Sequence, residues 1–357
     1  MSNVWGRNFT LSIFGESHGK GIGIVIGGLP AGLSLDFDAI DLEMARRAPG
    51  NSRLSTPRKE RDKYDILSGI KDNVLTGAPL CAVIKNENTR SRDYTLNLLR
   101  PGHADFTALM RYGGHGDMRG GGHFSGRLTA PLVFAGAVAR QALAASEIEI
   151  GARILSVSDI EDSPASPNEI IAASRKAFPT ADDSRGNMMQ KAILKAKSEG
   201  NSLGGVIQCT ATGIPPGWGN PFFTSVESTI SAMMFSIPAV KGIEFGEGFA
   251  LSRMTGYDAN DSLRMSHGRI TLASNKNGGV SGGISNGQPI QFNVCIRPTP
   301  TIAIPQKTVD IDTMENTEKS FQGRHDPCIV PRAVPVIEAA LALCLLDFKL
   351  DFISCQP

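Results

Sequence analysis

Short apolar segments joined by glycine turns constrain the fold of this chain more than any other feature. Residues 9–17 (FTLSIFGES) and 21–30 (GIGIVIGGLP) alternate in character around one such turn and are predicted to be strands. Strands joined by short turns pair antiparallel, which argues against a doubly wound parallel sheet. The sequence therefore predicts an α+β fold of antiparallel sheets packed against helices. Similar segments place further strands at 64–70, 73–86, 147–160, 204–215 and 288–302.

Helices are predicted from apolar periodicity and capping residues. The strongest covers residues 125–146, whose alanine-rich apolar content indicates that it is mostly buried. The stretch 333–350 is expected to be the last helix, interrupted by Glu338 and too short to span a bilayer. Other helices are expected at 36–50, 166–178, 186–200 and, followed by a strand, within 225–249. No proline- or serine-rich linker divides the chain, so residues 1–357 are treated as one domain.

Residues 322–335 (QGRHDPCIVPRAVP) place an arginine, a histidine and an aspartate in a row. Pro327 and Pro331 fix φ and withhold backbone donors. The stretch is therefore predicted to be a stiff loop rather than a helix or a central strand.

The overall composition excludes several classes of protein. With a net charge of +1, the chain has no global field for nucleic acid or a membrane, so an anion site must come from local clustering. The six cysteines have no metal-binding spacing and are interpreted as thiols of a reducing compartment. The N-terminus lacks the basic start and long apolar run of a signal peptide. We therefore expect a cytoplasmic location.

Glycines and basic residues gather at a few places. The 39 glycines concentrate at 15–28, 113–127 and 277–289, where they let the backbone approach a ligand closely. Six basic residues fall within 45–61, and arginine forks suit phosphate and carboxylate. Taken alone, however, that basic run is better interpreted as a solvated surface.

Five of the six histidines lie beside glycine or proline turns, a placement suited to proton transfer near neutral pH. They are His18, His103, His115, His123 and His325. No HExxH or His-x-His spacing supports a metal, so no metal site is predicted. Dinucleotide, P-loop and nucleophile-elbow motifs are also missing, which leaves a flavin or phosphate cradle open.

Eight short strings make the pattern specific. They are FGESHG, RRAPGNSR, RPGHADF, RGGG followed by FSGR, IPAVKGIEFG, GGVSGGISNGQPI, RPTPTI and GRHDPCIVPRAVPV. Their order and spacing resemble those of chorismate synthase over nearly the whole chain.

The resemblance implies a reaction, a cofactor and a fold. Members of that family convert 5-enolpyruvylshikimate 3-phosphate to chorismate and phosphate by 1,4-anti elimination, the last step of the shikimate pathway. This activity makes them carbon–oxygen lyases acting on phosphates. They need reduced FMN, which lends an electron transiently and recovers it. Their fold is a β-α-β sandwich with central helices, assembled as a homotetramer.

The resemblance also implies roles for individual residues. His18 matches the proton donor to the leaving phosphate, His103 a histidine beside the flavin, and Asp326 the acceptor of a proton from flavin N5. His325 is expected at most to orient its neighbours. The expected substrate-binding residues are Arg46, Arg47, Arg53, Arg100, Arg127 and Arg324. The expected flavin contacts are His123, Phe124, Ser125, Pro238, Ala239, Gly282, Arg297, Pro298, Thr299, Pro300, Thr301 and Arg324.

One departure from the family concerns the triple-glycine loop. Many members have GGGRSSARETA where this chain has GGGHFSGRLTA, so an arginine and a serine are replaced by His123 and Phe124. If His123 replaces the arginine as an anion partner, FMN affinity should fall as pH rises past about 6.5.

Two other interpretations remain open at the level of sequence. A non-catalytic flavin- or anion-binding protein would need the arginines but not His18, His103 and Asp326 together. A flavin oxidoreductase using NADPH would reduce its own flavin, but family members that do so carry extra segments. We therefore expect a separate flavin reductase, with NADPH involved only indirectly, and no nucleic-acid or membrane partner.

Overall fold

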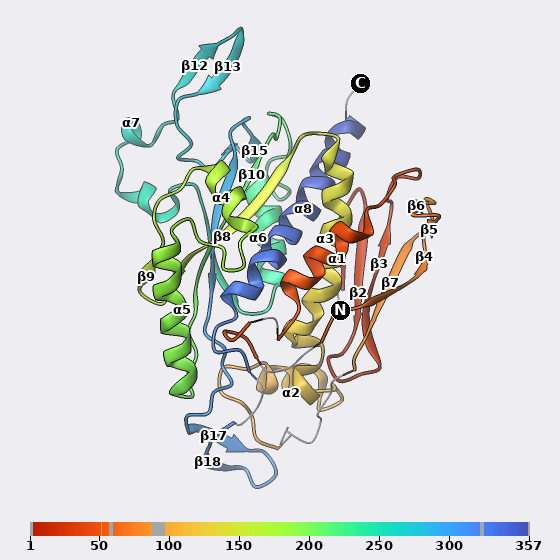
Figure 1. The fold of residues 1–357 in the computed structure, drawn as a ribbon, viewed down its shortest axis with the longest axis vertical. Coiled ribbons are helices and arrows are strands. Elements are labelled where there is room, and N and C mark those ends of the chain that lie inside the picture. Colours follow the sequence, from red (N-terminus) through yellow and green to blue (C-terminus); the bar gives the residue numbers. More distant parts are fainter. Residues whose placement is uncertain (1–2, 51, 57–59, 88–96, 322–324, 356–357) are drawn as a thin grey trace.

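The computed structural model describes residues 3–50, 52–56, 60–87, 97–321 and 325–355. Two five-stranded antiparallel sheets enclose a layer of helices (Figure 1). The first sheet has the order β1-β2-β3-β7-β4 and the second β11-β16-β10-β8-β9. This arrangement confirms the predicted β-α-β sandwich. The strand bounds are β1 Val4–Trp5, β2 Thr10–Gly15, β3 Gly21–Gly27, β4 Tyr64–Ser68, β7 Leu80–Lys85, β8 Glu149–Val157, β9 Ile160–Glu161, β10 Gly205–Thr212, β11 Val240–Phe245 and β16 Ile290–Ile296.

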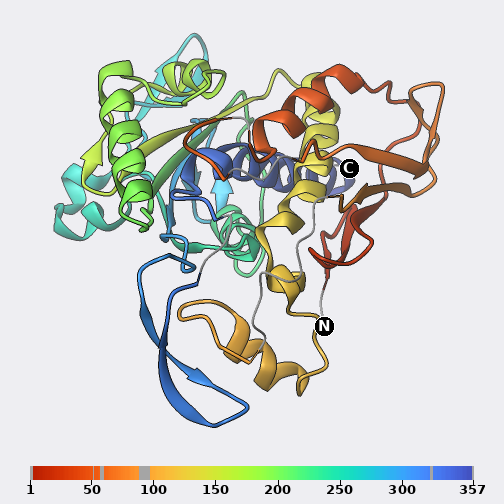
Figure 2. The ribbon, with the colours of Figure 1, turned by 60° about the horizontal axis from the view of Figure 1, so that its bottom comes forward.

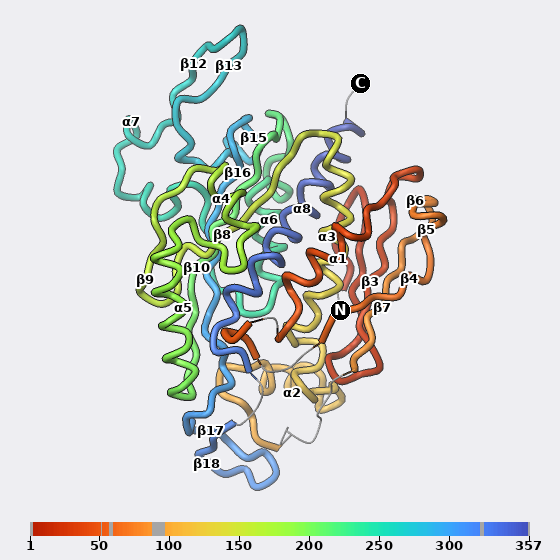
Figure 3. Tube along the Cα trace, in the orientation of Figure 1, coloured from red at the N-terminus to blue at the C-terminus, as the bar shows by residue number. Residues whose placement is uncertain are grey.

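The helices between the sheets are α1 (Phe37–Arg47), α3 (Thr129–Ala144), α6 (Val226–Ser236) and α8 (Val330–Cys355), as the tube in Figure 3 also shows. On the outer face of the second sheet, α4 (Pro167–Ser174) packs against β8, with α5 (Asp183–Ser198) beside it. Asp36 caps α1 and Ser166 forms a capping box at α4. The predicted helix positions are thus confirmed.

A glycine turn sets the register of the first sheet, as the alternating segments indicated. Gly15 ends β2 at φ +95°, and a Cβ there would lie 2.3 Å from the Gly21 carbonyl oxygen. Only glycine accepts both the positive φ and this close approach. The turn pairs Gly15 with Ile22, which buries Ile22, Ile24 and Ile26 toward the helices.

The long helices α3 and α8 cross closely in the centre. Gly136 of α3 would place a Cβ 2.3 Å from the Ala339 Cβ of α8, so the two backbones touch. Glu338, fully buried in α8, accepts hydrogen bonds from Arg46 (Nη1, 2.7 Å), Arg140 (Nη2, 2.9 Å) and the Ala152 amide (2.9 Å). This carboxylate therefore links α1, α3, α8 and β8.

Several elements differ from the expectations. The last helix begins at Val330, so the predicted loop 322–335 is wrong from that residue onward. Pro331 is tolerated because the first turn of a helix needs no amide donor there. The strand pair expected at 147–160 is present but uneven: β8 is long, and the short β9 begins at Ile160 and pairs with its end. A helix and two hairpins were not foreseen: α2 (Asp105–Tyr112), β12–β13 (Leu263–Ser266, Arg269–Leu272) and β17–β18 (Gln306–Asp310, Glu315–Lys319).

Figure 2 shows α2 and the β17–β18 hairpin together at one end of the molecule. A bridge between Asp310 of β17 and Leu98, which lies before α2 in the chain, joins the two segments there. Minor elements complete the chain: β5 Ile70–Lys71, β6 Val74–Leu75, η2 Arg119–Phe124, η3 Gly126–Leu128, η4 Gly248–Arg253, α7 Gly256–Ala259, β14 Val280–Ser281 and β15 Ile284–Ser285. Within the described ranges, no helix combines the length and apolar character needed to cross a bilayer.

Candidate active site

A cavity of about 540 Å³ lies where segments from both halves of the chain converge. Its walls come from the end of α1, residues 100–104, the η2–η3 segment, the α6–β11 link, residues 297–301 and the start of α8. The volume is typical of small-molecule sites.

The cavity is strongly cationic. Among its described lining residues, six cationic side chains face only two carboxylates, Glu60 and Asp326. The six are Arg47, Arg100, Arg127, Lys241, Arg297 and Arg332. Such a lining suits a ligand with several negative charges.

Two of these arginines share one buried carboxylate, Asp62. It accepts short hydrogen bonds from Arg47 and Arg127 and is only 3% exposed. Burial alone would raise the pKa of Asp62, but the two guanidiniums hold it below its ordinary value. Arg47 Nε also lies 3.3 Å from Thr129 Oγ1, and Arg127 Nε 3.1 Å from Asn86 Oδ1. Asp62 thus keeps both guanidiniums side by side at the wall.

Asp326 is oriented by two partners. The Thr56 amide donates to its Oδ1 at 2.8 Å, and Arg332 Nη1 lies 2.5 Å from its Oδ2. Arg332 Nε also donates to the Arg47 carbonyl oxygen at 3.1 Å. Arg332 was not among the expected site residues. A prediction that α8 begins at Val330 would have identified it, because the first turn of that helix places Arg332 beside Asp326.

Arg100 and His103 meet on another carboxylate, Asp105 at the start of α2. Asp105 accepts hydrogen bonds from Arg100 (Nη2, 2.7 Å) and lies 2.8 Å from His103 Nδ1. Burial would raise the Asp105 pKa, but the bonds from His103 and Arg100 hold it well below its usual range. Neither Asp62 nor Asp105 was expected at the site, because the sequence does not show the role of an acidic residue until its partners are placed.

The triple glycine brings two predicted histidines to neighbouring positions. A Cβ at Gly120 would lie 2.4 Å from His18 Nε2, and one at Gly121 would lie 3.2 Å from His103 Nε2. Both glycines have positive φ, +63° and +89°. His103 lines the cavity directly, whereas His18 lies behind Gly120, which itself lines the cavity.

His123 and Phe124, which replace the arginine and serine of the family pattern, differ in their position relative to the cavity. The His123 Nδ1 lies 2.9 Å from the Gly15 carbonyl oxygen, and His123 is not among the residues that line the cavity. The expected pH-dependent flavin affinity therefore has no structural basis. Phe124 does line the cavity and its ring lies 6.1 Å from that of Tyr112. Ser125 lines the cavity and caps η3 through the Arg127 amide.

Most of the other expected flavin contacts also meet here. Arg297 Nη1 donates to the Gly102 carbonyl oxygen at 2.8 Å, and its amide donates to the Ala239 carbonyl oxygen at 3.0 Å. These bonds join three distant segments into one wall. The expected contacts on that wall are Pro238, Ala239, Arg297, Thr299, Pro300 and Thr301.

The structure does not bring every expected residue to the cavity. Arg46 pairs with Glu338 and Glu43 instead, and Arg53 is exposed elsewhere. Pro298 does not line the cavity. Gly282 lies in the β14–β15 hairpin, where a Cβ would meet no described protein atom within 4 Å. Arg324 lies outside the described residues.

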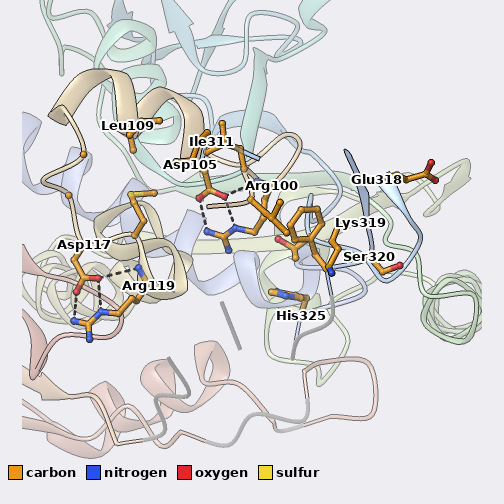
Figure 4. A pocket seen from close by; sticks show the side chains of 18 of the residues that line it. Arg100, Asp105, Leu109, Asp117, Arg119, Ile311, Glu318, Lys319, Ser320 and His325 are labelled. Carbon is orange, nitrogen blue, oxygen red and sulfur yellow. Dashed lines mark hydrogen bonds and ion pairs between the residues drawn. The ribbon is translucent and has the colours of Figure 1, made fainter. Parts of the chain in front are cut away.

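A second cavity of about 920 Å³ adjoins the first and shares Arg100, Thr301 and His325 with it (Figure 4). Its described lining balances three cations with three carboxylates, including the Arg119–Asp117 pair. Burial and the nearby Arg100 lower the pKa of His325 to about 4, so His325 is neutral at pH 7. The smaller cavity, rather than this one, therefore has the charge for an anionic ligand.

The smaller cavity also has features of a site for a flat, polar ligand. Gly126 lines it, and a Cβ there would meet no described protein atom within 4 Å. The Thr299 hydroxyl is buried and has no hydrogen-bond partner among the described residues. With the surplus of guanidinium groups, these features fit a flavin phosphate and ring. Within the described part of the chain, no three His, Cys, Asp or Glu residues gather as a metal site would require.

Comparisons with known proteins agree along the chain. The sequence profile of the chorismate synthase family matches residues 9–350. The chain is 45% identical over 353 residues to a chorismate synthase of Dehalococcoides mccartyi, covering 98% of this chain and 97% of that protein. It is 43% identical to a chorismate synthase of Korarchaeum cryptofilum, covering 97% and 96%. A crystal structure of chorismate synthase matches with a TM-score of 0.77 and 29% identity, covering 98% of this chain and 93% of that chain.

Proposed function

The chain belongs to the chorismate synthase family, and from that premise we propose that the smaller cavity holds 5-enolpyruvylshikimate 3-phosphate beside reduced FMN. The protein is a flavin-dependent carbon–oxygen lyase of the shikimate pathway that acts on a small-molecule substrate. The observation that carries the assignment of the site is the surplus of six cationic side chains over two carboxylates among the described residues of that cavity.

Charge matching supports the placement of the substrate. Its phosphate and two carboxylates carry roughly −3.5 to −4 charges at pH 7. Burying such a ligand requires partners, because an unpaired charge away from water costs several kcal/mol. We assign substrate binding to the cavity-lining arginines Arg47, Arg100, Arg127 and Arg332. Arg46 and Arg53 do not line the cavity and have no role in this assignment. Arg324 remains a prediction for both ligands.

The flavin is proposed to lie against Arg297, Thr299, Thr301, Phe124 and Ala239, which all line the same cavity. When bound, reduced flavin supplies a transient electron that eases departure of the allylic phosphate. Hydrogen bonds link Arg297 to the Gly102 and Ala239 carbonyl oxygens and so fix this wall of the cavity. The wall would therefore keep the bound flavin at a fixed distance from the substrate-binding arginines.

The remaining side chains are proposed to move or hold protons. Asp326 is placed to accept a proton, since Thr56 and Arg332 fix both of its oxygens at the cavity wall. His18 is proposed to donate a proton to the departing phosphate, and His103 to hold one beside the flavin.

An anaerobic assay tests this function directly. The protein, the phosphorylated substrate and photoreduced FMN are mixed without oxygen, and chorismate and phosphate are measured. We expect equal amounts of both products. Tight binding of both ligands without phosphate release would instead indicate a flavin- or anion-binding protein.

We also propose a homotetramer that receives reduced flavin from a separate reductase in the cytoplasm. Large exposed apolar side chains support association, since burying them in an interface is favourable. They include Phe222, Phe223, Phe249, Tyr257 and Met265. Native mass spectrometry should give four chains per particle. Bleaching of the bound flavin by NADPH alone, without a reductase, would contradict the proposed supply route.

A further inference from the structure

We infer that Asp105 is a positioning residue that holds His103 in one tautomer and locks Arg100 beside it. This inference rests on the proposed function, in which His103 and Arg100 both work at the smaller cavity. Asp105 falls within the string RPGHADF but was not among the expected site residues. It lines the larger cavity and not the smaller one, so it would act there only through its two partners.

The Asp105 carboxylate is shared between the two side chains by four contacts. Oδ1 lies 2.8 Å from His103 Nδ1 and 2.7 Å from Arg100 Nη2. Oδ2 lies 2.8 Å from Arg100 Nε and 2.9 Å from the Arg100 backbone amide. Asp105 is only 8% exposed. Both carboxylate oxygens are thus held by local protein donors.

The chemistry of this contact assigns the hydrogen atoms on the His103 ring. An ionised carboxylate can only accept hydrogen bonds, so Nδ1 must be the nitrogen that carries hydrogen. Turning the ring over would put a carbon against the carboxylate and would lose the bond. In the neutral ring, Nε2 is therefore the acceptor nitrogen, and it is the one that exchanges a proton with a ligand.

His103 lines the smaller cavity, so a ligand there can reach its ring. Nε2 lies against Gly121, where an added Cβ would come within 3.2 Å of it and crowd the ring. The preceding Gly102 is held by Arg297 through its carbonyl oxygen. The charged and titratable groups around this corner include Arg100, Arg297, His325 and, beyond His325, Asp326, and Asp105 is the carboxylate that contacts the His103 ring.

The position of Asp105 in the fold explains why it can do this. It is the first residue of α2, where a negative charge is favoured by the unpaired amides of the first turn. Arg100 and His103 lie in the tight turn just before that helix, where the His103 amide bonds the Arg100 carbonyl oxygen. Formation of α2 therefore brings the carboxylate to both side chains at once.

A spectroscopic measurement tests the inference without relying on activity. In full-length protein labelled with ¹⁵N-histidine, the His103 signals are identified from their loss in His103→Asn. At a pH high enough to leave the ring neutral, we expect hydrogen on Nδ1 and an unprotonated Nε2. Hydrogen on Nε2 instead, or rapid exchange between tautomers, would overturn the inference.

Steady-state kinetics test whether Asp105 acts through His103. We expect Asp105→Asn to lower kcat by at least about 10²-fold, as the loss of positioned acid–base help does. The double variant with His103→Asn should be no slower than His103→Asn alone within about threefold, because residues that act as one unit are not additive. Independent, multiplying losses would overturn the inference.

Two controls separate positioning from folding. Asp261→Asn removes a carboxylate that also accepts several local hydrogen bonds, in a different part of the chain, and should leave kcat unchanged. Asp105→Glu keeps the negative charge on a side chain that is one methylene longer. If Asp105→Asn folds poorly, this second variant should still show hydrogen on Nδ1 of His103. Should His103→Asn retain full kcat, the role given to His103 fails, while the tautomer measurement still decides on Asp105.

Discussion

Individual residues in this protein act mostly as members of carboxylate–guanidinium groups. Asp62 joins Arg47 to Arg127, Asp105 joins Arg100 to His103, and Asp326 joins Arg332 to the Thr56 amide. Each carboxylate offsets part of the positive charge that the cavity needs for its ligand. The arginines therefore stay ordered before any ligand arrives, which reduces the entropy lost on binding.

Asp326→Asn should separate catalysis from binding. We expect the affinities for FMN and substrate to stay within a few-fold, while kcat falls by at least about 10²-fold because the proton acceptor is lost. Fluorescence titration and stopped-flow measurement of turnover give the two quantities. An equal loss of binding would mean that Asp326 only supports Arg332.

Asp62→Asn should destabilise the protein at pH 7. It leaves two buried guanidiniums with an uncharged partner, which costs about 3–5 kcal/mol when a buried pair is broken. Asp65→Asn, which breaks an exposed pair with Lys85, is the matched control and should change the free energy of unfolding by less than about 0.5 kcal/mol. Urea denaturation of both variants measures the difference.

The same group predicts a pH dependence of stability. Folding lowers the Asp62 pKa below its ordinary value of 3.8. The ionised carboxylate therefore stabilises the fold fully above pH 3.8, and this contribution is lost as pH falls toward the lower folded-state pKa. The stability gap between wild type and Asp62→Asn should narrow over that range. A gap that stays constant down to the lowest pH at which both fold would contradict the assignment.

At the scale of elements, the η2 segment carries the site because its glycines allow close approach. Residues 119–124 turn beneath His18 and His103, and the backbone of Gly120 and Gly121 replaces side chains that would push both rings away. The glycine cluster was recognisable in the sequence as a ligand cradle. The pairing of one histidine with each glycine was not, since it depends on how β2, α2 and η2 pack.

Gly120→Ala should impair the site more than its backbone strain explains. Gly120 and Gly268 both have positive φ, +63° and +74°, so alanine costs about 1–2 kcal/mol at either. Only at Gly120 would the methyl group meet His18, at 2.4 Å, whereas Gly268 has no described atom within 4 Å. We expect both variants to lose stability, Gly120→Ala the more because of this contact, and kcat to fall for Gly120→Ala alone. Equal kcat values would show that His18 is not held by this contact.

At the scale of the whole molecule, the helical layer between the sheets positions the cavity. α8 supplies Arg332 at its beginning and Glu338 two turns later, and Glu338 ties α1, α3 and β8 together. One continuous apolar cluster includes residues of both sheets and of α1, α3, α6 and α8. This shared core supports our proposal that residues 1–357 form a single domain.

Substitution of the adjacent arginines should differ in its effect on KM, because Arg47 lines the cavity and Arg46 does not, although both form buried ion pairs. Arg46→Met should lower the free energy of unfolding, since Glu338 loses a buried partner, and leave KM within a few-fold. Arg47→Met should raise KM for the substrate at least about tenfold, because it removes a charged hydrogen-bond donor from the cavity wall. A raised KM for Arg46→Met, with unchanged stability, would restore Arg46 as a substrate-binding residue.

The order of the main strands and helices followed from the sequence alone, because alternation, glycine turns and capping residues act over a few neighbouring positions. The eight family strings likewise identified His103, Arg47, Arg100, Arg127 and Asp326, which do line one cavity. Local patterns also explain two of the errors. Pro331 made the first turn of α8 look like a loop, and the glycines on either side of α2 hid that helix.

Only the tertiary structure decided which charged residues face the ligand and which face the core. Arg46 and Arg47 are neighbours in sequence, yet the pitch of α1 turns one toward Glu338 and the other toward Asp62. Asp62 likewise took its place because Arg47 and Arg127, distant from it in sequence, lie beside it, whereas the partners of Asp105 and Arg332 are brought to them by the local turn before α2 and by the first turn of α8. Ion pairing depends on distance in space, which a pattern of neighbours along the chain does not contain.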